Sequence, residues 1–374
     1  LLLRIRPGHF PPLPGGARPD WWIVCEVARR LGFADAFAFT SPAEIFAEHA
    51  MLSGFENDGR RDFDISELAA RDYDTLEPVQ WPVSKGRGRA RHFDDGKFYT
   101  PDGRARFIAT PPPPPKATAP GRLILNTGRV RDHWHTMTRT GNTARLSGHY
   151  AEPFVEIHPD DADRLGIRGA TLVRLESEKG RALLRAQVTD RQRRGTVFAP
   201  MHWTGVYCSE GRVNALVTPQ ADPVSGQPGL KMSTVSLAPA QISLYGFAVS
   251  RERPVCEGVD YWATARALGG WRSELAFLDP LADPAALFGA GESLDILTYS
   301  DARSGRSSIA AFAGPSLVHA IWLSPDPVLV SRQWAIAQLE AHHENILQRN
   351  AVLSGRPGAG RPDPGPLVCS CFGV

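Results

Sequence analysis

The sequence LILNTGRVRDHWHTMTRTGNT, residues 123–143, decides how the rest of the chain is interpreted. Its first three residues form an apolar run just after a Pro-Gly break at 120–121, which predicts a strand starting at Leu123. The triplet Asn126-Thr127-Gly128 predicts a turn at the end of that strand. Beyond the turn, arginines, imidazoles, an indole and hydroxyls follow one another through residues 129–143. We therefore expect a strand that leads into a long polar loop.

The composition of this loop indicates a ligand site. A segment so rich in hydrogen-bonding groups is costly to bury unless something meets them. Glycine lets a backbone approach a ligand closely, and arginine forms paired bonds to phosphate. Tryptophan and histidine add flat surfaces with polar edges. A large, flat, anionic ligand with many hydrogen-bonding groups would satisfy all of these features together.

Three other interpretations of the loop remain open. His133 and His135 alternate as a strand would place them, so they could be a metal pair, although no carboxylate or cysteine lies nearby at ligand spacing. Arginine for phosphate and tryptophan for stacking could also serve nucleic acid, but one short loop is not a basic face. A plain structural loop would not explain why these residue types are concentrated in one place.

The ordered string Asn126–Thr136 resembles the loop with which molybdopterin oxidoreductases bind molybdopterin guanine dinucleotide. The run Thr136–Gly141 resembles bacterial assimilatory nitrate reductases in particular. The resemblance implies that the loop binds the cofactor through Thr127, Gly128, Arg129, Val130, Asp132, His133, Trp134, His135 and Thr136.

Three later residues are carried over from the same resemblance by their order and context. They are His202 in Pro-Met-His-Trp, Asn214 in Arg-Val-Asn-Ala-Leu and Lys231 in Gly-Leu-Lys-Met. In the family such positions contact the pterin and the phosphates. Their chemistry is suitable, because an amide can bond a pterin edge and an ammonium can meet a phosphate. Taken singly, each would be read as an ordinary surface or turn residue.

The composition and the net charge are typical of a globular protein. Its 374 residues leave room for two or three domains. The formal net charge of +2 is too small to indicate a polyanion partner, but residues 121–240 carry 16 basic and 11 acidic side chains. No apolar run reaches membrane-spanning length. We expect a cytoplasmic protein with neither nucleic acid nor membrane as a partner.

The two ends of the chain suggest a fragment. It starts with Leu-Leu-Leu-Arg and no methionine, so a targeting signal could lie upstream. The five cysteines are too sparse for a disulfide scaffold. No cysteine cluster in residues 1–120 has the spacing of the family's iron–sulfur site, which should lie upstream together with the molybdenum ligand. We expect the fragment alone to be inactive.

The expected fold class is a mixed α/β fragment, with a mostly-β double-psi β-barrel flanked by α/β segments. The resemblance makes residues 1–110 the tail of the catalytic body, which includes a strand-turn-strand over 98–107. Residues 111–120 are a proline-rich linker. The strand-helix-hairpin-strand pattern that begins at residue 121 resembles the cofactor barrel of the family and ends near residue 240.

The remaining residues follow the barrel. Residues 241–354 are expected to be a small α/β connecting region with paired strands and a helix over Ser331–Leu353. That helix would carry His342 and His343 as a solvated pair. Residues 355–366 are a second linker, rich in glycine and proline.

Residues 367–374 hold Cys369 and Cys371, one residue apart. So small a disulfide ring would be strained, and closely spaced thiolates suit iron–sulfur ligation. The segment resembles the start of the small 2Fe–2S domain of bacterioferritin-associated ferredoxin, which also ends many assimilatory nitrate reductases. Cys369 and Cys371 would then be two of the metal ligands.

The predicted function is the C-terminal, cofactor-binding portion of a molybdenum-dependent assimilatory nitrate reductase. The whole enzyme would reduce nitrate to nitrite at molybdenum held by two molybdopterin guanine dinucleotides. It would receive electrons from a donor protein or reductase subunit through 4Fe–4S and 2Fe–2S clusters. The alternatives are another molybdopterin oxidoreductase, such as a formate dehydrogenase, and a non-catalytic nucleotide-binding module.

Overall fold

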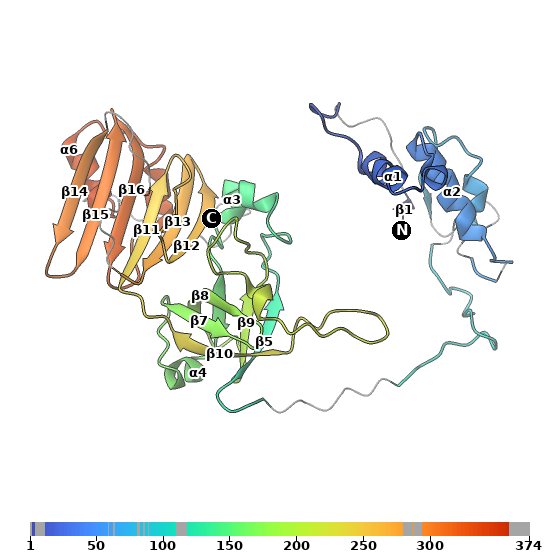
Figure 1. Cartoon of the computed structure of the whole chain (residues 1–374), viewed down its shortest axis with the longest axis horizontal. Helices are drawn as coiled ribbons and strands as arrows, with labels where there is room; N and C mark the ends of the chain where they lie inside the picture. Colours follow the sequence, from blue (N-terminus) through green and yellow to red (C-terminus); the bar gives the residue numbers. More distant parts are fainter. Residues whose placement is uncertain are drawn as a thin grey trace. The chain divides into compact units, whose positions relative to one another are not determined.

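The computed structural model describes residues 2–3, 12–58, 60–62, 64–80, 83–84, 87–88, 90–109, 118–279, 287 and 294–358. The chain divides into two compact units, Leu1–Pro114 and Pro115–Val374. Helices and strands carry the labels of Figure 1.

The first unit is mainly helical. Its helices are α1 (Asp20–Arg30), η1 (Asp35–Phe37), α2 (Pro42–Gly54) and η2 (Ser66–Leu68). At the start of α2, the hydroxyl of Ser41 accepts a hydrogen bond from the Glu44 N–H at 3.4 Å, which satisfies a free donor of the first turn. A small apolar core forms around Ala50, Ile65, Leu68 and Val83.

The strands of this unit are short. β1 (Leu2–Leu3) pairs with β2 (Val79–Gln80), and β3 (Val83–Ser84) pairs with β4 (Arg87–Gly88). The two strands of the strand-turn-strand predicted over residues 98–107 are absent, so that part of the prediction is wrong. The turn is present, with the Gly103 N–H donating to the Thr100 carbonyl at 3.0 Å, but the flanking residues are irregular.

The second unit begins with a closed six-stranded barrel in the order β10-β5-β9-β6-β8-β7. β5 pairs in parallel with β9, and β6 with β8, while the other pairs are antiparallel. The mixed α/β fold with a mostly-β barrel is thereby confirmed. The strands are β5 (Leu123–Gly128), β6 (Phe154–Ile157), β7 (Leu172–Glu176), β8 (Arg181–Val188), β9 (Thr196–Pro200) and β10 (Ser233–Pro239).

Alternation along the strands fills the barrel interior. In β8, Ala182, Leu184 and Ala186 are buried, as the period-two pattern of side chains on a strand requires. The short helix α4 (Pro159–Arg164) follows β6, and its Ala162 joins the same core. This packing fixes the end of β5, from which the polar loop leaves the barrel.

A six-stranded antiparallel sheet follows the barrel, in the order β12-β13-β11-β16-β15-β14. It makes residues 241–354 more extensively β than the small α/β region that the sequence led us to expect. The strands are β11 (Leu244–Ser250), β12 (Tyr261–Ala267), β13 (Gly270–Phe277), β14 (Asp295–Asp301), β15 (Arg306–Ala313) and β16 (Ser316–Ser324).

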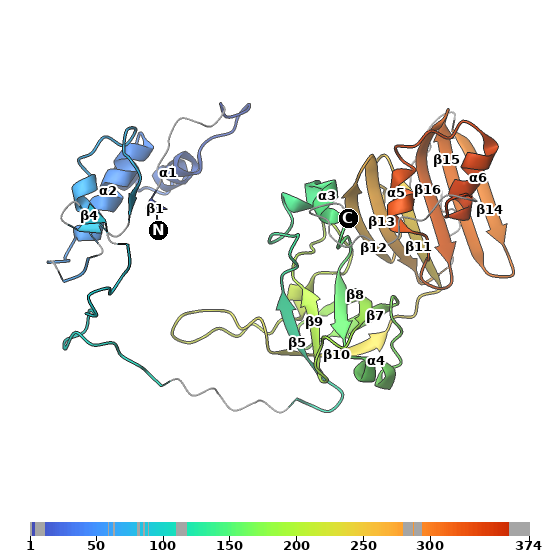
Figure 2. The same cartoon turned by 180° about the vertical axis from the view of Figure 1, so that it is seen from behind.

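Two short helices, α5 (Arg332–Ala337) and α6 (Ile346–Ser354), lie on one face of this sheet (Figure 2). Together they correct the single helix predicted over residues 331–353. Asn345 starts α6 with a capping box, and the His343 N–H donates to the Pro315 carbonyl at 2.7 Å, so the intervening chain is held against the sheet. His343 is buried, which contradicts the expected solvated pair.

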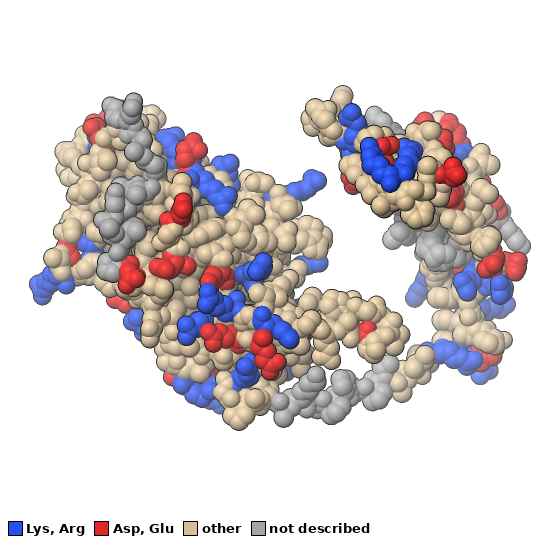
Figure 3. Space-filling model, viewed as in Figure 1, with Lys and Arg blue, Asp and Glu red and all other residues tan. Residues whose placement is uncertain are grey.

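Side chains of both charge signs are interspersed on the face seen in Figure 3. The barrel carries exposed ion pairs such as Arg181 with Glu210 and Arg174 with Glu176. Pairs of this kind contribute little to stability, because water screens them. Other ion pairs, at the junction between the barrel and the sheet, are buried.

Candidate cofactor-binding site

The turn predicted at Asn126-Thr127-Gly128 is wrong, because β5 continues through these three residues and the polar loop begins directly after the strand. The Thr127 hydroxyl donates to the Leu230 carbonyl at 2.8 Å, and Lys231 Nζ donates to the Thr127 carbonyl. Both bonds tie the end of β5 to the segment that precedes β10. The exposed Lys231 is thus held at the base of the loop formed by residues 129–143, called here the 129–143 loop.

Gly128 is required by close packing at this strand end. A Cβ atom built there would lie 2.7 Å from Cε2 of Phe198 on β9, closer than real Cβ atoms come to another heavy atom. The absence of a side chain therefore lets β5 and β9 stay paired up to the point where the loop begins.

His202 joins the two sides of the loop. Its Nε2 accepts from the Val130 N–H at 2.9 Å, and its Nδ1 lies 2.7 Å from the His135 carbonyl. Because a carbonyl oxygen only accepts, Nδ1 carries the proton and the ring is neutral. Burial lowers the pKa of His202, in agreement with this tautomer.

His133 and Asp132 are buried on the inner side of the loop. His133 Nε2 donates to the Tyr150 carbonyl at 2.9 Å, and Nδ1 lies 3.3 Å from the Thr140 hydroxyl. Burial lowers the pKa of His133, as expected for a neutral ring with both nitrogens engaged. The Asp132 carboxylate accepts from Arg131 Nε at 2.9 Å and meets His149 Nδ1 at 3.0 Å. A metal pair of His133 with His135 is therefore wrong.

The outer part of the loop has a strained backbone. His135 and Met137 adopt φ angles of 42° and 60°, in the left-handed region that residues other than glycine seldom occupy. The Tyr207 hydroxyl donates to the Met137 carbonyl at 3.1 Å. A Cβ atom on Gly141 would overlap the Tyr207 ring, so the ring can occupy this position only because residue 141 is a glycine. Surrounding contacts thus hold an unfavourable backbone in place, as is common at ligand sites.

Tyr207 and Tyr150 were not identified from the sequence. Their roles depend on contacts with residues far away along the chain, and no local pattern marks those contacts. The only signal was that Tyr207 follows His202 closely in the segment after β9.

The outward side of the loop presents a cation and two rings. The Arg129 guanidinium carbon lies 4.6 Å from the centre of the Trp134 ring, and the rings of Trp134 and His135 meet edge to face at 4.4 Å. Trp134 is 58% exposed, and Arg129, His135 and Thr136 are also exposed. An exposed cation–π pair of this kind offers a stacking surface beside a positive charge.

The structure thus divides the predicted site residues into two groups. Thr127, Val130, Asp132, His133 and His202 are buried and shape the loop. Gly128 lies at the strand end, and Arg129, Trp134, His135, Thr136 and Lys231 face outward. Asn214 is exposed on η4 (Val213–Leu216), which packs against β8.

Among the described residues, no group of three or more His, Cys, Asp or Glu side chains could hold a metal ion. Cys369 and Cys371, the predicted cluster ligands, lie outside the described residues, as does most of the linker before them. Within the described ranges, no helix is long and apolar enough to cross a membrane.

Comparison with known proteins defines the class of this site. The family described as "Molydopterin dinucleotide binding domain" matches residues 123–234, which include the 129–143 loop and Lys231. This part of the chain is therefore a molybdopterin dinucleotide-binding domain. The family match ends at the start of β10, before the six-stranded sheet.

The whole chain is similar to nitrate reductases. It is 37% identical to a nitrate reductase of Klebsiella oxytoca over 98% of this chain and 42% of that protein. A nitrate reductase of Shewanella frigidimarina is 34% identical over 69% of this chain and 31% of that protein. The putative formate dehydrogenase YrhE of Bacillus subtilis is 33% identical over 60% of this chain and 22% of that protein.

The chain spans less than half the length of these three relatives. It is homologous to molybdopterin oxidoreductases, and the similarity to a nitrate reductase extends over nearly all of its residues.

Proposed function

We propose that this chain is the cofactor-binding portion of a molybdenum-dependent, assimilatory nitrate reductase. The observation that carries the proposal is the outward pair of Arg129 and Trp134 on a loop whose backbone is fixed from behind, with Lys231 at the base of that loop. Its chemistry suits a ligand that combines phosphates with flat heterocycles. Similarity to a nitrate reductase over 98% of the chain supports the choice of substrate.

The residues present fit molybdopterin guanine dinucleotide. Arg129 and Lys231 would meet its phosphates, Trp134 and His135 would lie against a ring, and Gly128 and Thr136 would border it. Asn214 would bond a pterin edge. When bound, the cofactor supplies the molybdenum centre at which nitrate is reduced to nitrite.

The buried residues have a different part in this proposal. Val130, Asp132, His133 and His202 use their polar groups within the protein, so they orient the loop instead of bonding the ligand directly. A loop fixed in advance binds with a smaller loss of conformational entropy. The chain's own contribution is therefore to bind the cofactor and hold its orientation.

A formate dehydrogenase is the second candidate, because YrhE matches the chain at comparable identity. That match covers 60% of the chain, whereas the Klebsiella protein matches 98%. The complete gene product, purified from a host that makes the cofactor, would be assayed with reduced viologen and nitrate and, separately, with formate and oxidised viologen. Nitrate reduction without formate oxidation supports the proposal, and the reverse result rejects it.

Electron entry is part of the same proposal. Cys369 and Cys371 would provide two ligands of a 2Fe–2S cluster, and a 4Fe–4S cluster elsewhere in the whole enzyme would relay electrons from a donor protein in the cytoplasm. Soft thiolates at this spacing suit such a cluster. The gene product would be reconstituted with iron and sulfide. A rhombic EPR signal on reduction that is lost in Cys369→Ser is expected, and a signal that survives in Cys369→Ser would reject the assignment.

A further inference from the structure

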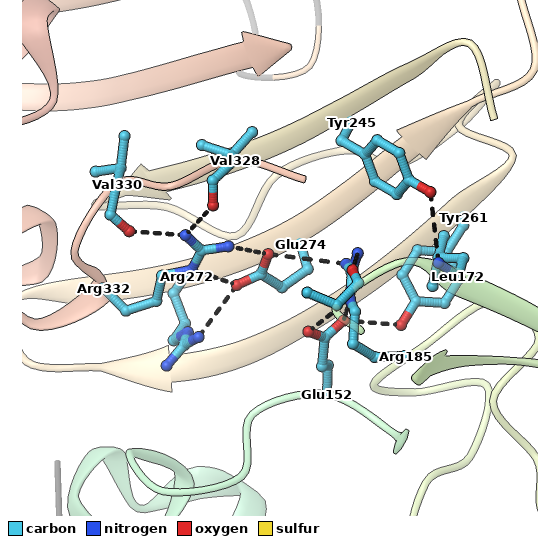
Figure 4. A network of polar contacts seen from close by, with 11 residues as sticks. Glu152, Leu172, Arg185, Tyr245, Tyr261, Arg272, Glu274, Val328, Val330 and Arg332 are labelled. Carbon is cyan, nitrogen blue, oxygen red and sulfur yellow. Dashed lines mark hydrogen bonds and ion pairs between the residues drawn. The ribbon is translucent and has the colours of Figure 1, made fainter. Parts of the chain in front are cut away.

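The six-stranded sheet lies outside the region matched by the dinucleotide-binding family, yet it meets the barrel through a buried network of charges (Figure 4). At its centre is Glu274 on β13, which is 3% exposed. Its carboxylate accepts from Arg332 Nε at 2.9 Å and Arg332 Nη2 at 2.7 Å, and from Arg272 Nη2 at 3.1 Å. Burial alone would raise the pKa of Glu274, but these arginines outweigh it and lower the pKa to about 2.

Arg185 carries the network into the barrel. It lies on β8, and its Nη2 is 3.9 Å from the Glu274 carboxylate. Its Nε donates to both carboxylate oxygens of Glu152, at 3.0 and 3.1 Å. The hydroxyl of Tyr261, on β12 of the sheet, donates to the same carboxylate at 3.1 Å. Glu152 is therefore held by one residue of the barrel and one of the sheet.

The segment that contains Glu152 lies directly behind the 129–143 loop. Two residues earlier, the Tyr150 carbonyl accepts from His133 at 2.9 Å. One residue before that, His149 meets Asp132 at 3.0 Å. The network thus reaches the two buried polar side chains of the loop through four consecutive residues, 149–152.

A second connection runs from β12 to the outer part of the loop. The Thr264 N–H donates to the Tyr207 carbonyl at 2.8 Å, and the next residue, Cys208, forms a β-bridge with Ala263. The Tyr207 hydroxyl in turn holds Met137, one of the two residues with positive φ. Main-chain bonds of the sheet therefore fix the residue that constrains the loop.

We propose that the six-stranded sheet positions the 129–143 loop for the cofactor, with Glu152 and Tyr207 as the positioning residues. This role rests on the proposed function of the loop as a cofactor-binding element. A buried ion pair with two hydrogen bonds, as between Arg185 and Glu152, holds one arrangement of the groups it joins, and an added strand bridge restricts the same loop from the other side. Tyr207 acts on the loop through the Met137 carbonyl, and Glu152 acts through the segment 149–152, which bonds the side chains of Asp132 and His133.

The first test is hydrogen exchange of the 374-residue chain without cofactor. Tyr207→Phe removes only the hydroxyl that bonds Met137. Local opening of the loop should become easier, and loop amides such as those of Met137 and Gly141 should exchange roughly three- to tenfold faster. The matched control is Tyr245→Phe. It removes a buried hydroxyl at the same junction, where the Leu172 N–H donates to it at 3.4 Å, and it should leave loop exchange unchanged.

The second test is Glu152→Gln, which keeps the size of the side chain and removes its charge. Exchange of the Val130 amide and its neighbours should rise by a similar factor, while the amides of β7 and β8 keep their rates. The matched control is Glu156→Gln on β6, whose partner Arg191 belongs to the barrel alone. A loss of protection spread evenly over the barrel would indicate general destabilisation and overturn the positioning role.

These outcomes separate the two proposals, because exchange is measured without cofactor. Faster loop exchange in Tyr207→Phe and Glu152→Gln, with both controls unchanged, supports positioning by the sheet even if the gene product retains no molybdopterin guanine dinucleotide. Unchanged loop exchange in both variants rejects positioning by the sheet even if the cofactor is retained. Equal acceleration in the controls rejects it as well.

Discussion

The backbone N–H of Val130 donates to Nε2 of His202 at 2.9 Å, across 72 positions of sequence. With its other nitrogen, His202 bonds the His135 carbonyl, so one neutral ring spans the beginning and the middle of the 129–143 loop. This places His202 behind the binding surface and not on it.

His202→Phe should destabilise the protein by about 2–4 kcal/mol. The substitution leaves the buried Val130 N–H and the partly buried His135 carbonyl without partners, and a fully buried group left unpaired costs about 1–3 kcal/mol. The free energy of unfolding would be measured with urea. The control His135→Ala changes an exposed ring in the same loop and keeps the carbonyl, so it should change the free energy by about 0.5 kcal/mol or less. A loss below that value for His202→Phe would refute its bridging role.

The protein should lose stability as the pH falls below about 6.5. Burial lowers the pKa of His133, His202 and His343, and lowers that of His319 to about 4. Below the ordinary value near 6.5, the unfolded chain therefore binds more protons than the folded chain.

The stability from these histidines is fully present above pH 6.5 and is lost as the pH falls toward the folded-state values. Each contributes at most about 1.4 kcal/mol per pH unit. The carboxylate of Glu274, with a pKa of about 2, stays charged throughout this window. Urea unfolding at pH 7, 6 and 5 checks the slope, and stability that is flat or rises toward pH 5 would contradict it.

The sequence predicted the strand at Leu123 and the polar loop that follows it, because each is set by neighbouring residues. It did not predict which loop residues are buried. Arg129 and His133 have similar polarity, yet one faces outward and the other bonds Tyr150, and only the three-dimensional path of the chain decides this. The single helix predicted over 331–353 is wrong because a contact distant in sequence decides the path of the chain. The hydrogen bond from the His343 N–H to the Pro315 carbonyl overrides local helix propensity.

Gly141→Ala should cost about 1–3 kcal/mol, because the new methyl group must displace the Tyr207 ring. Gly205→Ala is the control, since nothing lies within 4 Å of a Cβ atom at that position. Its effect should stay within about 1 kcal/mol. Thermal unfolding of both variants measures the difference. Equal stability of the two variants would mean that Tyr207 does not pack against Gly141 as described.

Glu274→Gln should cost about 3–5 kcal/mol, because three arginines lose the carboxylate they surround. The control Asp295→Asn breaks an exposed ion pair with Arg349 and should cost about 1 kcal/mol or less. Urea unfolding of the 374-residue chain gives both values. A loss for Glu274→Gln as small as that of the control would show that the buried network does not hold the sheet to the barrel.

The most direct test of the account is the retention of molybdopterin guanine dinucleotide by the complete gene product. Guanine nucleotide released by acid would be quantified after extensive dialysis, for the natural protein, for Arg129→Ala and for the barrel control Arg174→Ala, whose side chain is paired with Glu176. Loss of a charge-assisted bond should weaken binding roughly ten- to hundredfold, so Arg129→Ala should lose the nucleotide and Arg174→Ala should keep it. Equal retention in Arg129→Ala and the natural protein, or no guanine nucleotide in either, would contradict the account.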